Sequence, residues 1–427
     1  MTHDTIFALS SGRPPAAISI IRMSGPRAHE WGKAICGDLP DARTAAVREL
    51  RHPETKELLD ESLVLRFDGP ASSTGENSVE FQCHGGRAVV DAVLNVLAGL
   101  EGLRPAAPGE FTRRAFENGR IDLTEAEGLA DLIEAETEAQ RKAALRIAEG
   151  GLRRQIEQWQ QELLALSARA EAAIDYVDEG DVRVDEDLLR DCAGLARTLG
   201  EWLNLPRAKP LKEGVRVVVA GPANVGKSSL INAIAGQERA IVTDIPGTTR
   251  DHIEVPLSIE GLPLLLTDTA GLRATEDRVE RIGVERAQTL ASSADILVWL
   301  GEPAEAPDHA RLILVHSRSD LPERANAPSG SLPVSSGTGE GLAALLEEVV
   351  ATARALLPAE DAIALNRRQA KTIGDAQHAL AQVEGAPDIV LIAEFLREAR
   401  AAFDRLTGRA GVDDVLDALF GRFCLGK

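Results

Sequence analysis

Residues 221–228 read GPANVGKS and follow the apolar run VRVVVA at 215–220. A continuous apolar run of this kind is typical of a buried parallel strand. The pattern therefore predicts a glycine-rich turn between a strand and a helix that covers 229–235. In such a turn, backbone N–H groups face a phosphate chain, Lys227 reaches the outer phosphates and the Ser228 hydroxyl binds Mg²⁺. The stretch indicates a P-loop nucleotide-binding domain.

Strands and helices are expected to alternate after this turn, as an α/β domain requires. The predicted strands are 253–259, 263–267, 296–300, 312–315 and 332–335. The pair Glu260-Gly261 reads as a hairpin turn, and the last helix of the domain ends before Pro358. We therefore expect a Ras-like P-loop domain at 214–357, inserted into a helical domain made of 119–213 and 358–427.

The flanking segments have a different character. Residues 1–118 mix strand-like runs at 17–22 and 62–67 with an apolar helical stretch at 88–100, which predicts a small α+β domain. Thr124 to Glu127 reads as a capping box, and helical spacing then continues to about Tyr176 without a proline. A second helical run, 187–205, stops at Pro206 and Pro210. The chain is thus expected to be a multidomain α/β and α protein.

The composition excludes several classes of protein. A net charge of -20 argues against global attraction to a polyanion, so any nucleic-acid contact must be local. Apolar content of 44% and charged content of 27% exclude a disordered chain, and no apolar run reaches the length of a membrane span. The N-terminus lacks the pattern of a secretion signal, and the four cysteines are widely separated, so we expect free thiols in the cytoplasm.

Two downstream segments supply the expected partners of the P-loop. Asp268-Thr269-Ala270-Gly271 follows a strand, which predicts Asp268 beside the metal and the Gly271 N–H at the γ-phosphate. Between them lies Gly247 to Asp251, whose Thr248 and Thr249 hydroxyls can complete the Mg²⁺ shell when the γ-phosphate is present. These hydroxyls also suit the cap of an ordinary turn.

The base is expected to be guanine. Asp320 in SRSD, residues 317–320, can accept two N–H bonds that adenine cannot supply, although GTPases usually carry Asn-Lys-x-Asp there. Ser335 and Ser336 suit the loop that closes over the base. Leu272 stands where Ras-like proteins place a water-orienting Gln, so the charged stretch 273–280 is the expected source of a catalytic group, or simply a solvated helix start.

At this point the chain resembles the MnmE (TrmE) family of tRNA uridine modification GTPases over essentially its whole length. The N-terminal DTI, the STGE and EFQCHGG stretches and PGEFTRRAF at 108–116 resemble the folate-binding domain of that family. The entry to the helical domain, NGRIDLTEAE, and the loops TDIPGTTRD, DTAGLR and VERIG are similar as well. The last residues, FCLGK at 423–427, resemble the family's Cys-Ile-Gly-Lys ending.

The resemblance implies an enzyme that works with the flavoprotein MnmG, which carries FAD, in a heterotetramer. Together they would add an aminomethyl or carboxymethylaminomethyl group to C5 of the wobble uridine of tRNA, using GTP hydrolysis and 5-formyl- or 5,10-methylenetetrahydrofolate. The resemblance also implies a homodimer whose GTPase domains meet across K⁺. The predicted GTP site comprises Asn224, Val225, Gly226, Lys227, Ser228, Ser229, Thr243, Asp244, Ile245, Pro246, Gly247, Thr248, Thr249, Asp268, Thr269, Ala270, Gly271, Asp320, Ser335 and Ser336.

Carried over residue by residue, the family motif assigns further roles. Ser228 and Thr249 would hold Mg²⁺, and K⁺ would be held by Asn224, Thr243, Ile245 and Thr248. Catalytic roles fall to Lys227, to Glu280, which would orient water through a second shell, and to Cys424. Folate would be bound by Arg22, Glu80, Arg120 and Lys427, with Arg120 standing where the family usually has Lys.

The residues alone leave other interpretations open. Arg22 and Glu80 suit a folate carboxylate and a pterin N–H edge, but they equally suit an ion pair with each other. Cys424 beside Phe423 also fits a buried apolar residue, and the basic stretch between Arg141 and Arg154 either touches tRNA phosphates or balances neighbouring Glu residues. The alternative function is a regulatory switch GTPase of the ribosome-assembly type, without modification chemistry.

Overall fold

The computed structural model describes residues 4–175, 186–205, 208–222, 224–237, 239–240, 254–268, 294–359, 362–410, 413–423 and 426. Contacts between Cα atoms divide the chain into two compact units. Unit 1 contains residues 1–130 and 404–427, and unit 2 contains 131–403. The two ends of the chain therefore belong to the same unit.

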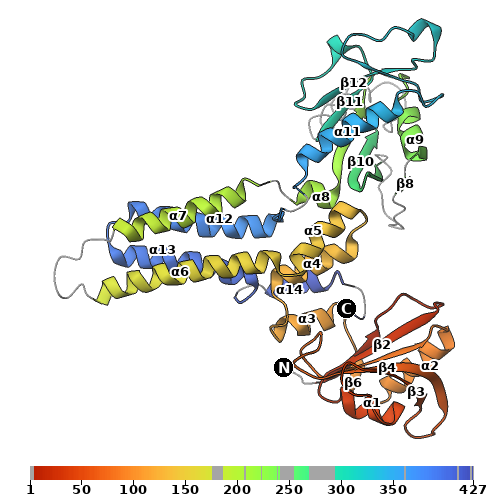
Figure 1. Cartoon of the computed structure of the whole chain (residues 1–427), viewed down its shortest axis with the longest axis vertical. Helices are drawn as coiled ribbons and strands as arrows, with labels where there is room; N and C mark the ends of the chain where they lie inside the picture. The colour runs from red at the N-terminus through yellow and green to blue at the C-terminus, as the bar shows by residue number, and fades with distance from the viewer. Residues whose placement is uncertain are drawn as a thin grey trace, which may run out of the picture. The chain divides into compact units, whose positions relative to one another are not determined.

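Unit 1 is built on a mixed six-stranded sheet with the order β3-β4-β5-β2-β1-β6 (Figure 1). Its strands are β1 (Thr5–Leu9), β2 (Ile18–Ser24), β3 (Ala45–Arg51), β4 (Leu58–Phe67), β5 (Ser78–His84) and β6 (Leu103–Pro105). Its helices are α1 (Ala28–Cys36), α2 (Arg87–Ala98), α3 (Glu110–Glu117), α4 (Leu123–Glu134, up to residue 130) and α14 (Asp413–Phe420). The predicted α+β character of the N-terminal segment is confirmed.

Helices α1 and α2 cover one face of this sheet. Ile35 of α1 and Val93 of α2 are fully or almost fully buried against Ile21 and Phe81 of the sheet. Because side chains alternate across a strand, Arg22 and Glu80 point to the opposite face. That face is the one that carries the polar residues discussed below.

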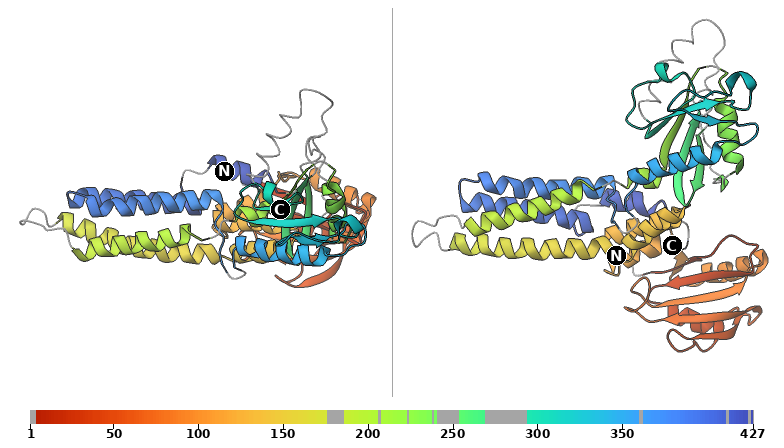
Figure 2. Two further views of the ribbon diagram at one scale, coloured as in Figure 1. Left: turned by 90° about the horizontal axis from the view of Figure 1, so that it is seen from above. Right: turned by 45° about the horizontal axis from the view of Figure 1, so that its top comes forward.

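The helical part of unit 2 contains long helices that run side by side (Figures 1 and 2). They are α6 (Gly151–Asp175), α7 (Glu186–Leu203), α12 (Arg367–Ala381) and α13 (Ile389–Thr407, up to residue 403). The shorter helix α5 (Glu138–Ala148) precedes α6. Trp159 is buried between the long helices. Its ring packs edge-on against Trp202 and is stacked with the ring of Phe403. The predicted helical run 187–205 is confirmed as α7.

One detail of the predicted helices is wrong. The box that starts α4 is formed by Asp122 and Glu125, not by Thr124 and Glu127, because the Asp122 carboxylate accepts the Glu125 N–H and Glu125 accepts the Asp122 N–H. The helical pattern to Tyr176 is interrupted. Thr137 begins a new helix with its own capping box, and Gly150, with φ +79°, separates α5 from α6.

The remainder of unit 2 is a seven-stranded sheet with the order β13-β12-β11-β7-β10-β9-β8. The strands are β7 (Val215–Ala220), β8 (Arg239–Ala240), β9 (Glu254–Ile259), β10 (Leu262–Asp268), β11 (Ile296–Trp299), β12 (Leu312–Ser317) and β13 (Leu332–Val334). Its helices are α8 (Lys209–Glu213), α9 (Lys227–Gln237) and α11 (Leu342–Leu356). The central strands are parallel, and β9 runs antiparallel to β10 through the predicted Glu260-Gly261 turn, which is confirmed.

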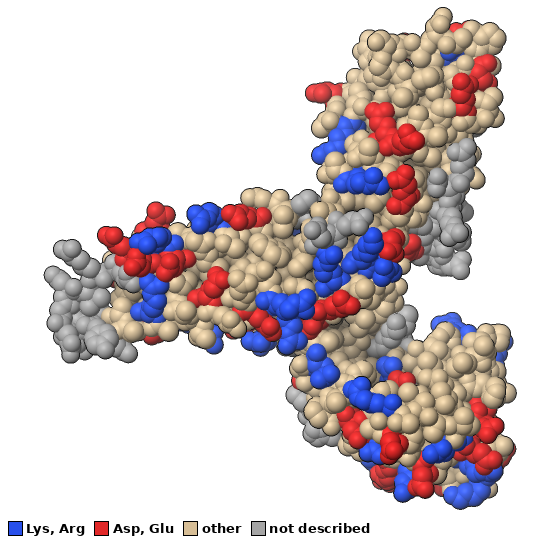
Figure 3. Space-filling view, viewed as in Figure 1, with Lys and Arg blue, Asp and Glu red and all other residues tan. Residues whose placement is uncertain are grey.

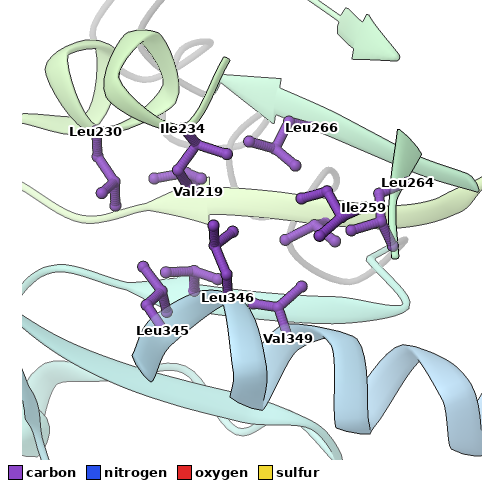
Figure 4. A pocket seen from close by; sticks show the side chains of 11 residues that line it. Val219, Leu230, Ile234, Ile259, Leu264, Leu266, Leu345, Leu346 and Val349 are labelled. Carbon is purple, nitrogen blue, oxygen red and sulfur yellow. The ribbon is translucent and has the colours of Figure 1, made fainter. Parts of the chain in front are cut away.

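Apolar side chains from this sheet and from its helices pack against one another (Figure 4). Val219, Leu264 and Leu266 meet Leu230 and Ile234 of α9 on one side, and Leu345, Leu346 and Val349 of α11 complete the cluster. The space they enclose measures about 10 Å³, which is roughly one water molecule. This interior is therefore a packed core that fixes β7, β10 and α9, the elements that carry the phosphate loop.

None of the helices in the described part of the chain is both long and apolar enough to span a bilayer.

Candidate functional site

The phosphate loop lies where the sequence predicts it, between β7 and α9. Gly221 and Gly226 have φ values of +146° and +104°, which only glycine adopts readily. A β-carbon at Gly221 would also lie 3.3 Å from the backbone of Leu300, which is a tight contact in addition to the strain of the positive φ. Asn224 has φ +60°, a conformation that Asn tolerates better than most residues. The loop is thus bent in the way that phosphate binding requires.

Lys227 is held inside this loop. Its ammonium group donates to the carbonyls of Gly221 at 2.8 Å and Pro222 at 2.7 Å, and the residue is only 7% exposed. Burial lowers the pKa of Lys227, and the nearby Asp268 carboxylate opposes that shift. Carbonyl groups of the loop itself therefore hold the side chain in place.

Ser228 and Asp268 face each other across the end of the loop. The Ser228 hydroxyl donates to the Asp268 carboxylate at 2.6 Å, and Asp268, at the end of β10, is 2% exposed. Strands β10 and β7 are parallel neighbours, so both residues come from the same edge of the sheet. A hydroxyl and a carboxylate are the oxygen ligands that Mg²⁺ accepts, so these two residues fit the predicted metal.

The predicted base-binding residues lie beyond the same edge. Asp320 is exposed in the turn after β12, and the Ser319 N–H donates to Val334 O at 3.3 Å. Ser335 is fully buried, and its hydroxyl accepts the N–H groups of Gly337 and Thr338, so it shapes its own turn. Ser336 lies in that turn. Val225 and Ser229 lie in the phosphate loop and the first turn of α9.

Sequence reasoning missed two residues that join the base loop to the phosphate loop. The Ser317 hydroxyl donates to the Val225 carbonyl at 2.8 Å, and the Arg318 guanidinium donates to the Asn224 carbonyl at 2.6 Å. The signal was present in the sequence, because Ser317 and Arg318 occupy the first two places of the guanine motif. Only the coordinates show which backbone groups they reach.

In unit 1 the structure pairs two predicted folate residues. Arg22 of β2 and Glu80 of β5 are directly opposite in the sheet, and two guanidinium nitrogens lie 2.8 Å from Glu80 Oε1. The Arg22 guanidinium also lies 5.7 Å from the centre of the Phe111 ring. The ion pair that the sequence left open therefore exists.

The C-terminal segment meets the same sheet. The Ser10 hydroxyl, just after β1, donates to the Gly426 carbonyl at 2.9 Å. Ala8 is paired with Arg22, so Ser10 lies on the same face of the sheet as Arg22. Arg120 is exposed, close to Gly75 and Asn118, and has no contact with Arg22 or Glu80 among the described interactions.

An ionic network beside this face was also not predicted. The buried Arg114 guanidinium contacts Asp4, Glu76 and Glu110, and Arg104 contacts Asp4 and Glu110. Glu76, Arg104, Glu110 and Arg114 line an open groove that continues to α14. Since each of them is paired within the network, its evident role is to fix α3 to the start of β1.

The other predicted site residues lie outside the described part of the chain. They are Thr243, Asp244, Ile245, Pro246, Gly247, Thr248, Thr249, Thr269, Ala270, Gly271, Glu280, Cys424 and Lys427.

Two arginines of the basic stretch on α5 and α6 pair with acidic residues of their own helices. Arg141 is paired with Glu138, and Arg153 with Glu157. Figure 3 shows Lys and Arg interspersed with Asp and Glu over the visible surface, rather than gathered in one field. These pairs favour the interpretation in which the stretch balances neighbouring Glu residues.

Two family models match the chain. Residues 5–120 match the model described as "GTP-binding protein TrmE N-terminus", and residues 123–424 match the "MnmE helical domain". Proteins named "tRNA modification GTPase MnmE" match over the full length. Those of Erythrobacter litoralis, Novosphingobium aromaticivorans and Zymomonas mobilis are 50%, 48% and 48% identical, and each alignment covers 99% of this chain and 100% of the relative.

Proposed function

Because the chain belongs to the MnmE family of tRNA modification GTPases, we propose that it hydrolyses GTP in order to modify C5 of the wobble uridine of tRNA. The group added is an aminomethyl or carboxymethylaminomethyl group, with a tetrahydrofolate as the one-carbon donor. The observation that supports this proposal best is the Ser10–Gly426 hydrogen bond. It places Gly426, which stands between Cys424 and Lys427 in the sequence, beside Ser10 on the sheet face that carries Arg22.

In the GTPase part, Lys227 neutralises the outer phosphates. Ser228, Asp268 and Thr249 would hold Mg²⁺, which would supply positive charge next to the phosphates. The Gly221 and Pro222 carbonyls release the Lys227 ammonium when phosphate oxygens replace them. Asp320 accepts the two N–H groups of the guanine edge. Asn224, Thr243, Ile245 and Thr248 would hold K⁺, and Glu280 would orient the attacking water.

In the folate part, Arg22 and Glu80 bind opposite kinds of group. Both contacts between them use Oε1 of Glu80, which leaves Oε2 to accept N–H groups of the pterin. Arg22 has N–H groups beyond those two for a carboxylate. Arg120 and Lys427 are the further residues proposed to bind the folate, and Cys424 is the proposed reactive thiol.

The proposed partners are tRNA, a second copy of the chain and a MnmG-type flavoprotein that carries FAD, in a heterotetramer in the cytoplasm. Two apolar side chains on the Arg22 face of the sheet, Ile18 and Val47, are each 57% exposed. We propose three functional domains: the folate-binding domain at 1–118, the helical domain formed by 119–213 and 358–427, and the GTPase domain at 214–357.

Mass analysis of wobble nucleosides tests this function. In cells that lack the gene, the modified uridine is expected to disappear and to return with the full-length chain. A chain that ends at Phe423 is expected to hydrolyse GTP but not to restore the nucleoside. If the nucleoside persists in cells that lack the gene, the protein is instead a regulatory switch GTPase. If the shortened chain restores the nucleoside fully, the tail has no chemical role.

A further inference from the structure

The guanine motif of this chain is unusual at its first position. Ser317 replaces the usual Asn, and its hydroxyl donates to the Val225 carbonyl at 2.8 Å. Ser317 is 6% exposed, so water does not compete freely for this bond. The residue therefore ties the end of β12 to the phosphate loop.

The number of hydrogen-bond donors on its side chain limits which further groups Ser317 can bind. A serine hydroxyl has one O–H donor, whereas an Asn amide has two N–H donors. Guanine presents N7 and O6 as acceptors on one edge and N1–H and N2–H₂ as donors on the other. While Ser317 donates to Val225, it has no donor left for N7. An Asn at this position has one N–H for the loop and a second for the base.

Arg318 strengthens the same connection. Its guanidinium donates to the Asn224 carbonyl at 2.6 Å, one residue before the carbonyl that Ser317 uses. Both Asn224 and Arg318 have φ +60°. Two neighbouring side chains thus hold two neighbouring carbonyls of the phosphate loop. Asp320, exposed in the following turn, is left to read the base.

We propose that Ser317 is a positioning residue, which sets Asp320 in register with the phosphate loop, and that this chain reads guanine through N1–H and N2–H₂ without a contact to N7. This inference rests on the proposed role of Asp320. It predicts a nucleotide specificity that differs from that of a GTPase with Asn at the same position.

The probe is 7-deaza-GDP, in which a C–H group replaces N7. Titration calorimetry on the full-length protein with Mg²⁺ is expected to give affinities for GDP and 7-deaza-GDP that agree within about twofold. The Ser317→Asn variant is expected to prefer GDP by roughly 3- to 10-fold, the range of one neutral hydrogen bond. A wild-type preference for GDP of fivefold or more overturns the proposal, as does a Ser317→Asn variant without any preference.

Ser317→Ala keeps the test decisive if the larger Asn disturbs the fold. Loss of the hydrogen bond to the Val225 carbonyl is expected to weaken the binding of GDP and of 7-deaza-GDP equally, by roughly 3- to 10-fold. Unchanged affinity for both nucleotides would show that Ser317 positions nothing. Asp320→Asn tests the underlying assignment separately, because it should shift preference towards xanthosine diphosphate. If that shift is absent, the proposed base pocket fails, whatever the result with 7-deaza-GDP.

Discussion

The Ser10 hydroxyl, one residue after β1, lies 2.9 Å from the carbonyl of Gly426. Gly426 has φ +89°, and a β-carbon there would lie 2.3 Å from the Leu9 carbonyl oxygen. The tail can therefore approach the sheet this closely only with glycine at this position.

Replacing Gly426 with Ala should displace the tail. We expect the modified wobble nucleoside to fall about tenfold or more in cells that carry Gly426→Ala, while the GTP hydrolysis rate of the purified protein stays unchanged. Gly12→Ala is the matched control, because a β-carbon at Gly12 meets no atom within 4 Å. Equal nucleoside levels in the two variants would argue against a functional role for the tail's position.

The cation dependence of GTP hydrolysis tests the proposed role of Asn224. We expect the rate in K⁺ to exceed that in Na⁺ by about 10- to 100-fold, the scale of losing one electrostatic stabiliser. Asn224→Gly keeps the φ of +60° without strain but removes the amide, so it should lose the K⁺ stimulation and keep the Na⁺ rate. Equal wild-type rates in both salts would remove K⁺ from the mechanism.

The ionic network of unit 1 predicts a stability that depends on pH. Burial raises the pKa of Glu110, but Arg104 and Arg114 outweigh that effect, so the pKa lies below its ordinary value of 4.5. The stabilisation is therefore present above pH 4.5 and is lost as the pH falls towards the lowered pKa. Glu110→Gln should lower the free energy of unfolding by about 1–3 kcal/mol at pH 7, and the difference should shrink below about pH 4. Urea unfolding at both pH values checks this, and a constant difference contradicts it.

The three described cysteines should be unreactive in the folded protein. Burial raises the pKa of Cys36, Cys83 and Cys192 to about 11. At pH 8 roughly one thiol in a thousand is then ionised, and thiolate is the form that iodoacetamide attacks. Peptide mass mapping should find these three alkylated only after unfolding. Rapid labelling of the native protein at all three positions would show that their surroundings open readily.

The local pattern of the sequence was enough to predict the phosphate loop. A strand, a turn with glycines at fixed positions and a helix are set by neighbouring residues, so β7, the loop and α9 appear where they were expected. The helix start at Asp122 was mistaken for one at Thr124, since both residue types cap helices and only the coordinates show which side chain accepts the Glu125 N–H.

Contacts between distant segments were beyond such reasoning. The Arg22–Glu80 pair depends on the register of β2 and β5, and the bond from Ser317 to Val225 depends on where β12 ends beside the phosphate loop. The approach of Gly426 to Ser10 joins residues 416 positions apart. No periodicity in the sequence encodes that approach, although the resemblance to the MnmE family had already assigned folate-related roles to both ends of the chain.

The most direct test of the account is calorimetric titration of 5-formyltetrahydrofolate into the full-length protein and into a chain that ends at Phe423. Binding of the folate by the full-length chain, with at least tenfold weaker binding by the shortened chain, is the predicted result. Equal affinities, or no binding by the full-length chain at millimolar folate, would contradict the claim that the tail and the N-terminal sheet form one site.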